Sequence, residues 1–338
     1  MGKDKLKVFV AMSGGVDSSV AAFLLQEKGY EVVGCHFICW EGCDSNEDRR
    51  DAMRVAAKLG IPFLTFDFRQ EYREKVFDYM VKEYELGRTP NPDVMCNKYI
   101  KFGIFLEKAL EMGADFIATG HYVRKEMDNL YAAKDKNKDQ SYFLWRLDRE
   151  KISRSLFPIG GYLKSEVREI AKKAGLPTAE KKDSQGLCFV GKVNFQDFLR
   201  GYLPRKEGSV INPEGKILGK HDGAYFFTPG QRHGLKLGGF SRPLYVAEKD
   251  LEVNTVTAVY LGDPILYKKE IEVSELNTTG GLPEKILARI RYRQPLEPCR
   301  IENSKVIFDS PQRGVAPGQS IVFYSNEGLI LGGGIIEK

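Results

Sequence analysis

Residues Ala11-Met12-Ser13-Gly14-Gly15-Val16-Asp17-Ser18-Ser19 decide how the fold of this 338-residue chain is interpreted. They follow the apolar, β-branched run Lys7–Ala11, which predicts a buried parallel strand, and they lead into Ser18–Lys28, whose apolar spacing predicts a helix. Glycines lack a Cβ atom, so the main chain can direct several N–H groups toward one anion. Serine hydroxyls and the positive end of the helix dipole add to this preference. The stretch therefore predicts a phosphate-binding loop.

This loop differs from the two commonest nucleotide-binding motifs. The Walker A motif needs a lysine after its last glycine, the dinucleotide motif needs three spaced glycines, and neither pattern occurs here. An ordinary glycine-rich turn is the simpler alternative. However, Ser13–Ser18 match the SGGxDS loop and so resemble the ATP pyrophosphatases, enzymes that cleave ATP to AMP and pyrophosphate while activating an oxygen as its adenylate. The resemblance implies that ATP is a substrate.

Length, charge and cysteine content narrow the class of protein. The chain is long enough for two or three domains, and its net charge of +5 favours a polyanionic partner. It has no apolar run that could cross a membrane and no signal-peptide core, so we expect a cytoplasmic enzyme without a membrane partner. Six cysteines do not make a disulfide scaffold at this length. The run Cys35-x3-Cys39-x3-Cys43 has the spacing of neither zinc sites nor cluster-binding loops, and we expect no metal site there.

The order of expected segments predicts the architecture. Helix-like and strand-like segments alternate from residue 7 to about residue 120, which predicts a doubly wound parallel sheet with helices on both faces. Such sheets bind ligands at the carboxyl ends of their strands, where the glycine loop, Phe37 and Gly120 would lie. Beyond residue 203, short strands between turn residues predict a small β-rich domain and then a β-barrel. We expect an ATP-binding catalytic domain over 1–202, a central β-rich adaptor over 203–265 and a C-terminal barrel over 266–338.

Two isolated cysteines lie in segments that favour a reactive thiolate. Cys96 comes just before a helix expected over Asn97–Met112, whose N-terminal dipole would lower the pKa of the thiol. Asp93, three residues earlier, is placed to accept or pass on a proton. Cys188 follows two lysines, whose field would also favour the thiolate. Each thiol is alternatively an inert buried side chain, and only the fold can bring the two together.

One of the expected strands in the β-rich part carries a candidate binding surface. A strand over Ile286–Tyr292 would place Arg289, Arg291 and Arg293 on one face. Such a row suits phosphates and stacked bases, although a solvated edge strand explains it equally well. A strand with no assigned role is expected over Tyr225–Leu235.

Taken together, six motifs closely resemble the tRNA-specific 2-thiouridylases, in that family's order and across nearly the whole chain. The motifs are Ser13–Ser18, Asn91–Phe102, Ala118–Tyr122, Lys138–Phe143, Gln185–Phe189 and Arg291–Gln294. The resemblance implies that ATP, with Mg²⁺, activates the 2-oxygen of the wobble uridine in the tRNAs for Lys, Glu and Gln, and that sulfur then replaces it.

The resemblance also implies roles for single residues. Cys188 would carry a persulfide from a donor such as a cysteine desulfurase or a sulfur-relay protein, Cys96 would be the nucleophile, and Asp93 would handle protons. The two thiols would end as a disulfide that is reduced in each cycle. An iron–sulfur cluster on these three residues stays an open alternative. The expected ATP contacts are Ala11, Met12, Ser13, Gly14, Gly15, Val16, Asp17, Ser18, Phe37 and Gly120, and the expected tRNA contacts are Asn91, Pro92, Asp93, His121, Lys138, Asp139, Gln140, Arg291, Tyr292 and Gln319.

Two other functions stay open from the sequence. The same fold could adenylate a small-molecule acceptor, as argininosuccinate- or NAD-forming synthetases do, but the cysteine pair and the basic barrel would then have no use. A tRNA-binding protein without catalysis would leave the phosphate loop unexplained.

Overall fold

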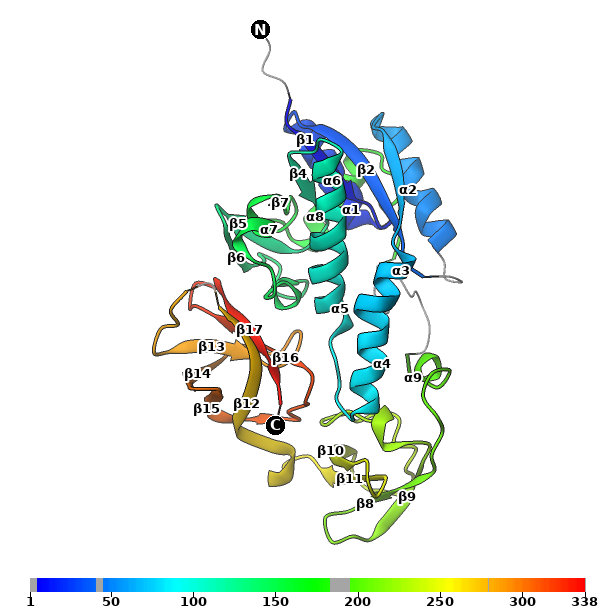
Figure 1. The fold of residues 1–338 in the computed structure, drawn as a ribbon, viewed down its shortest axis with the longest axis vertical. Helices are drawn as coiled ribbons and strands as arrows, with labels where there is room; N and C mark the ends of the chain where they lie inside the picture. Colours follow the sequence, from blue (N-terminus) through cyan, green and yellow to red (C-terminus); the bar gives the residue numbers. More distant parts are fainter. Residues whose placement is uncertain (1–4, 41–44, 183–194, 279, 338) are drawn as a thin grey trace. The chain divides into compact units, whose positions relative to one another are not determined.

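The computed structural model describes residues 5–40, 45–182, 195–278 and 280–337. The chain forms two compact units (Figure 1). The first contains residues 1–77, 92–193 and 327–330, and the second contains 78–91, 194–326 and 331–338. The division into three domains, with boundaries after residues 202 and 265, is not tested by these two units and stays a prediction.

The first unit is built on a five-stranded parallel sheet with the strand order β3-β2-β1-β4-β7. The central strand β1 pairs with β2 in the register Lys7↔Glu31 to Ala11↔Cys35. Its three middle residues are buried, as expected for a strand covered on both faces. The strands are β1 (Lys7–Ala11), β2 (Glu31–Ile38), β3 (Phe63–Asp67), β4 (Phe116–Ala118) and β7 (Ser155–Leu156).

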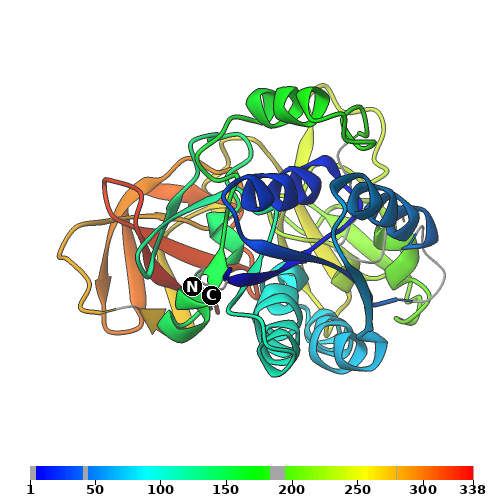
Figure 2. The same ribbon diagram turned by 90° about the horizontal axis from the view of Figure 1, so that it is seen from above.

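Helices cover both faces of this sheet, which confirms the predicted doubly wound class. Figure 2 shows α1, α2 and α8 on one face and the helical segment that ends in α6 on the other. The apolar side chains of β1, α1 and α8, including Val8, Val20 and Val167, form one buried core. These helices are α1 (Val16–Glu27), α2 (Ser45–Leu59), α6 (Phe105–Glu111) and α8 (Lys164–Lys173). Smaller elements of the unit are the hairpin β5 (Val123–Glu126) and β6 (Asn129–Ala132), η3 (Ser141–Phe143) and α7 (Arg149–Ser153).

Two helical stretches are more irregular than the sequence predicted. The first continues through α3 (Arg69–Tyr72), the π-helical η1 (Arg73–Phe77) and α4 (Asp78–Glu85). The second, expected to begin at Asn97, begins at Pro92 with α5 (Pro92–Met95) and continues through the π-helical η2 (Cys96–Ile104) into α6. Proline is accepted at the first helical position because an N–H there has no partner within the helix. The predicted helix start was therefore about one turn too late.

The second unit contains a four-stranded sheet with the order β10-β11-β8-β9. The prediction of a strand over Tyr225–Leu235 is wrong. That segment forms the 3₁₀ turn η4 (Ala224–Phe226) and then a loop, because Pro229 removes a donor and Gly230 and Gly234 adopt positive φ values of 83° and 90°. The sheet strands are β8 (Gly208–Ile211), β9 (Ile217–His221), β10 (Leu244–Asp250) and β11 (Thr255–Tyr260), and α9 (Phe195–Leu199) precedes them.

The C-terminal part forms a closed barrel with the strand order β12-β15-β14-β13-β16-β17. Its interior is filled by apolar side chains such as Phe308 and Phe323, which are fully buried. This architecture confirms the predicted barrel. The turn η5 (Pro264–Leu266) leads into β12 (Tyr267–Thr278), which is followed by β13 (Ile286–Arg289), β14 (Glu297–Glu302), β15 (Lys305–Arg313), β16 (Ser320–Tyr324) and β17 (Ile330–Ile336). Across the described ranges, every helix falls short of the length or apolar character that crossing a bilayer demands.

Candidate functional site

The loop between β1 and α1 depends on one glycine. Gly14 has a φ of +75°, and a Cβ atom there would lie 2.2 Å from the main-chain oxygen of Asp48. Gly15 is the N-cap of α1 and supplies no side-chain capping bond, which leaves the first N–H groups of the helix for another acceptor. An anion such as phosphate is the acceptor that these groups and the helix dipole favour.

Serine hydroxyls fix the shape of this loop. Ser18 Oγ accepts a hydrogen bond from the Ser13 N–H at 3.2 Å and donates to the Gly15 oxygen at 3.2 Å. Ser19 Oγ donates to the same oxygen at 2.8 Å and lies 3.0 Å from the Thr178 hydroxyl, which donates to it. The loop is therefore held in place by its own side chains, while Ser13 is exposed.

The segment after β4 packs directly on the start of α1. A Cβ atom at Gly120 would lie 2.6 Å from the Ser18 nitrogen, so only glycine allows this approach. The structure thus brings together two of the predicted ATP-contact segments. Phe37, another predicted ATP contact, lies on β2. Its ring packs against Phe68 and Phe105 with centroid distances of 5.3 and 4.6 Å. Its side chain belongs to an aromatic cluster, which leaves main-chain atoms for any ligand.

An ion pair beside the loop supplies the cation that the loop sequence lacks. Asp17 lies in the first turn of α1, and Lys164 Nζ donates to both of its carboxylate oxygens at 2.8 Å. The Tyr122 hydroxyl donates to the same carboxylate at 2.8 Å. The Lys164 side chain is only 12% exposed, and it comes from the first turn of α8. Sequence reasoning missed this lysine, because nothing local connects it to the loop.

Replacing Lys164 by Met tests whether this cation serves the phosphate chain. We expect the affinity for ATP to fall by about 10- to 100-fold, because a charge-assisted partner is lost and Asp17 is left unbalanced. The affinity for AMP should change much less, and isothermal titration of both nucleotides would measure the difference. The matched control is Lys134→Met. Lys134 pairs with Glu166 of α8, the helix that carries Lys164, but the Lys134 side chain is 47% exposed. Equal losses for ATP and AMP would contradict a role at the phosphates.

The predicted nucleophile lies in a buried helical segment. Cys96 follows the first turn formed by Pro92–Met95 and is fully buried, so it is not at the helix N-terminus as predicted. Asp93 lies in that first turn, half-buried, and precedes Cys96 by one helical turn, which places the two on one face. The neighbouring Asn97 donates from Nδ2 to the Phe143 oxygen at 3.2 Å and so joins the helix to the Lys138–Phe143 motif. Cys188 lies outside the described residues, and its pairing with Cys96 stays a prediction.

Three of the predicted tRNA contacts have internal partners. Asp139 is 4% exposed, and its Oδ1 accepts from the N–H groups of Ala133 and Ser141 at 3.0 and 3.2 Å. Gln140 Oε1 accepts from the Tyr122 N–H at 3.0 Å. His121 is buried with Nδ1 at 2.7 Å from the Thr119 hydroxyl, and burial holds its pKa well below the usual range, so the ring is neutral at neutral pH. These contacts fix the motif and leave Lys138 partly exposed beside it.

In the barrel, the predicted row of three arginines does not form. Strand β13 ends at Arg289, which is buried with its Nη2 donating to the Tyr324 hydroxyl at 2.8 Å. Arg291 lies in the following turn and donates to the Pro229 and Gly314 oxygens, the second at 2.6 Å, and Arg293 has a positive φ of 65°. The alternation ends because the chain leaves the strand before the second arginine.

Two further predicted tRNA contacts, Gln319 and Tyr292, lie in the second unit. Gln319 Nε2 donates to the Thr89 and Pro90 oxygens at 2.8 and 3.1 Å. Gln319 therefore holds the segment that leads to the buried Asn91. Tyr292 lies beside Arg293, whose guanidinium carbon is 4.9 Å from the ring centroid.

The described residues were also considered as ligands for a metal ion. No group of three or more His, Cys, Asp or Glu side chains is arranged there to hold a metal ion. Asp17 is a carboxylate beside the phosphate-binding loop, and oxygen ligands of this kind suit Mg²⁺ that is shared with a nucleotide. Of the three residues considered for an iron–sulfur cluster, Asp93 and Cys96 lie in the described ranges and Cys188 lies outside them.

Family models match nearly the whole chain. A "tRNA methyl transferase HUP domain" matches residues 6–192, a "tRNA methyl transferase PRC-barrel domain" matches 196–260, and an "Aminomethyltransferase beta-barrel domain" matches 268–336. The tRNA-specific 2-thiouridylase MnmA of Enterococcus faecalis is 45% identical over 99% of this chain and 96% of its own length. The protein of the same name in Pseudomonas savastanoi pv. phaseolicola is 47% identical over 98% of this chain and 94% of its own length. Among solved structures, the U34-tRNA thiolase NcsA from Methanococcus maripaludis with its [4Fe-4S] cluster aligns with a TM-score of 0.38 and 22% identity, over 59% of this chain and 64% of its own.

Proposed function

Because the chain belongs to the tRNA-specific 2-thiouridylases, we propose that it uses ATP to activate the 2-oxygen of the wobble uridine and then replaces that oxygen with sulfur. The tRNAs for Lys, Glu and Gln are the proposed substrates. The observation that carries the ATP step is the phosphate-binding loop, where Gly14 permits a close main-chain approach to Asp48. Gly120, in the segment after β4, packs on the start of α1, and Lys164 pairs with Asp17 beside the loop.

The first proposed step is adenylation of the base. A carbonyl oxygen is a poor leaving group, so the uridine O2 attacks the α-phosphorus of ATP and pyrophosphate departs. The N–H groups at the start of α1 and the Lys164 ammonium, which pairs with Asp17, would stabilise the charge that gathers on the departing phosphates. Mg²⁺, held at Asp17 and the phosphates, would supply further neutralisation when bound. The target base must leave the anticodon stack to reach such a site.

The second proposed step exchanges sulfur for the activated oxygen. The terminal sulfur of a persulfide on Cys188 attacks C2 of the base, and AMP leaves with the former 2-oxygen. The Cys96 thiolate then attacks the Cys188 sulfur, the S–S bond of the persulfide breaks, and its electron pair stays on the sulfur now bound to the base. The product is a Cys96–Cys188 disulfide, which a reductant must open before the next cycle. Asp93, one helical turn from Cys96, is the proposed proton carrier.

The proposal requires a protein that delivers persulfide sulfur, either a cysteine desulfurase or a relay protein. It places the enzyme in the cytoplasm, where its tRNA substrates are. In the iron–sulfur alternative, Asp93, Cys96 and Cys188 would hold a cluster, and Cys188 lies outside the described ranges.

Release of pyrophosphate from ATP, measured with and without unmodified tRNA, tests the proposed function. We expect release that depends on tRNA and stops when the tRNA already carries 2-thiouridine. Release with a small acceptor and no tRNA would support a synthetase of the argininosuccinate- or NAD-forming type. Binding of tRNA with no release under any condition would support a non-catalytic role.

A further inference from the structure

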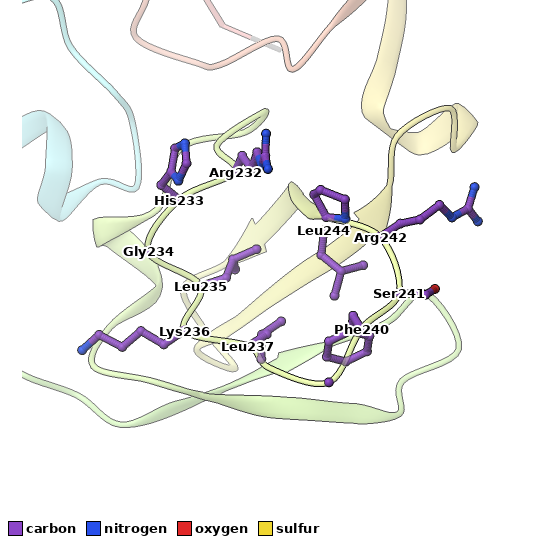
Figure 3. A pocket seen from close by; sticks show the side chains of 12 residues that line it. Arg232, His233, Gly234, Leu235, Lys236, Leu237, Phe240, Ser241, Arg242 and Leu244 are labelled. Carbon is purple, nitrogen blue, oxygen red and sulfur yellow. The ribbon is translucent and has the colours of Figure 1, made fainter.

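A basic loop in the second unit is not used by the proposed chemistry. Residues 232–243 lead into β10 and surround an open hollow of about 420 Å³ (Figure 3). Leu235 and Leu244 are buried and anchor the loop to the unit, whereas Arg232, Lys236 and Arg242 are exposed. The loop is therefore fixed at its base and presents its cations outward.

The charge of this loop is not balanced by neighbouring acids. The sequence contains no Asp or Glu from residue 223 to residue 247. None of Arg232, Lys236 and Arg242 forms an ion pair with any described residue. The guanidinium carbon of Arg242 lies 4.8 Å from the ring centroid of Tyr260, which supports the side chain without removing its charge. Cations without counter-charges keep a positive field for an external partner.

The main chain of the loop adds further donors. Between residues 232 and 242, no main-chain N–H donates a hydrogen bond to another residue of the described ranges. Positive φ values at Gly234 (90°), Lys236 (52°) and Gly239 (81°) interrupt the extended backbone. Backbone that alternates between negative and positive φ directs neighbouring N–H groups to one side, where they bind anions. Phe240 is 38% exposed and offers a ring on which a base can stack.

We propose that this loop, residues 232–243, binds the phosphate backbone of the tRNA substrate. Figure 3 shows the Arg232, Lys236 and Arg242 side chains leaving the loop in different directions. Side chains that diverge do not converge on a single small phosphate, but they can contact successive phosphates of a polymer. The inference rests on tRNA being the substrate. It does not depend on the adenylation or sulfur steps, and its test measures binding alone.

The test removes the three cations together, as Arg232→Gln, Lys236→Gln and Arg242→Gln in one full-length variant. Binding of unmodified tRNA is measured by filter retention at several salt concentrations. We expect the dissociation constant to rise about 10-fold or more at moderate salt. The slope of log K against log salt should become shallower by about 2 to 3, because three phosphate contacts are lost.

A second variant separates this local effect from the change in net charge. This control keeps residues 232–243 unchanged and instead replaces three exposed lysines that have no ion-pair partner in the described ranges. All three lie at the amino edge of the parallel sheet, away from the glycine loop. They are changed as Lys5→Gln, Lys28→Gln and Lys58→Gln. This control should keep the wild-type slope and affinity to within about 2-fold. An unchanged slope in the loop variant, or equal losses in both variants, would overturn the inference.

Discussion

Cys96→Ser is expected to abolish 2-thiouridine formation while tRNA binding stays within about 2-fold of the wild type. The substitution changes a single buried atom from sulfur to oxygen, so the helix that begins at Pro92 should be retained. A hydroxyl cannot open a persulfide to form a disulfide, and the transfer would therefore stop. Thiolated tRNA would be measured as retardation of the tRNA on a mercury-containing gel.

The control for this prediction is another buried cysteine. Cys299 lies in β14 inside the barrel, and burial raises the pKa of its thiol to about 12, so it stays protonated and unreactive. Cys299→Ser should leave thiolation intact, with some loss of stability. Thiolation by Cys96→Ser at a rate near that of Cys299→Ser would remove Cys96 from the reaction.

Gly14→Ala is expected to eliminate ATP binding, with a loss of about 100-fold or more in affinity. The added Cβ atom would lie 2.2 Å from the Asp48 oxygen, closer than any real contact, and the φ of +75° is also unfavourable for alanine. The loop would have to move, and its N–H groups would no longer converge. Titration with ATP measures the affinity, and thermal unfolding reports the accompanying loss of stability.

Gly29→Ala is the control for Gly14→Ala, because it introduces backbone strain at a positive φ without a steric clash of the new Cβ atom. Gly29 has a φ of +85°, and a Cβ atom there would meet nothing within 4 Å. This variant should lose about 1 kcal/mol of stability through strain alone and should bind ATP normally. If Gly14→Ala binds ATP as well as Gly29→Ala does, the glycine loop is not the phosphate site.

The sequence predicted the features that depend on local pattern. The alternation of segments around Lys7–Ala11 was enough for the parallel sheet, because buried parallel strands are continuous apolar runs. The failures have local physical causes as well. Pro92 indicated a loop although it starts a helix, and the apolar content of Tyr225–Leu235 outweighed its proline and glycines in the prediction. The arginine row failed because periodicity does not show where a strand ends, here at Arg289.

The parts of the site that depend on distant contacts were beyond prediction from the residues alone. Lys164 and Tyr122 meet Asp17 only because α8 and the segment after β4 pack against α1. Asp139 and Gln140 matched a motif for tRNA contact, but their hydrogen bonds to Ala133 and Tyr122 show that they also fix the chain locally. A motif gives residue identity, whereas the partner of each side chain is set by tertiary packing.

Analysis of the wobble nucleoside by mass spectrometry tests the central claim most directly. Unmodified tRNA for Lys would be incubated with the enzyme, ATP, Mg²⁺ and a persulfide source, then digested to nucleosides. The account predicts 2-thiouridine in amounts that depend on both ATP and persulfide. Cleavage of ATP with no sulfur in the wobble nucleoside would contradict it.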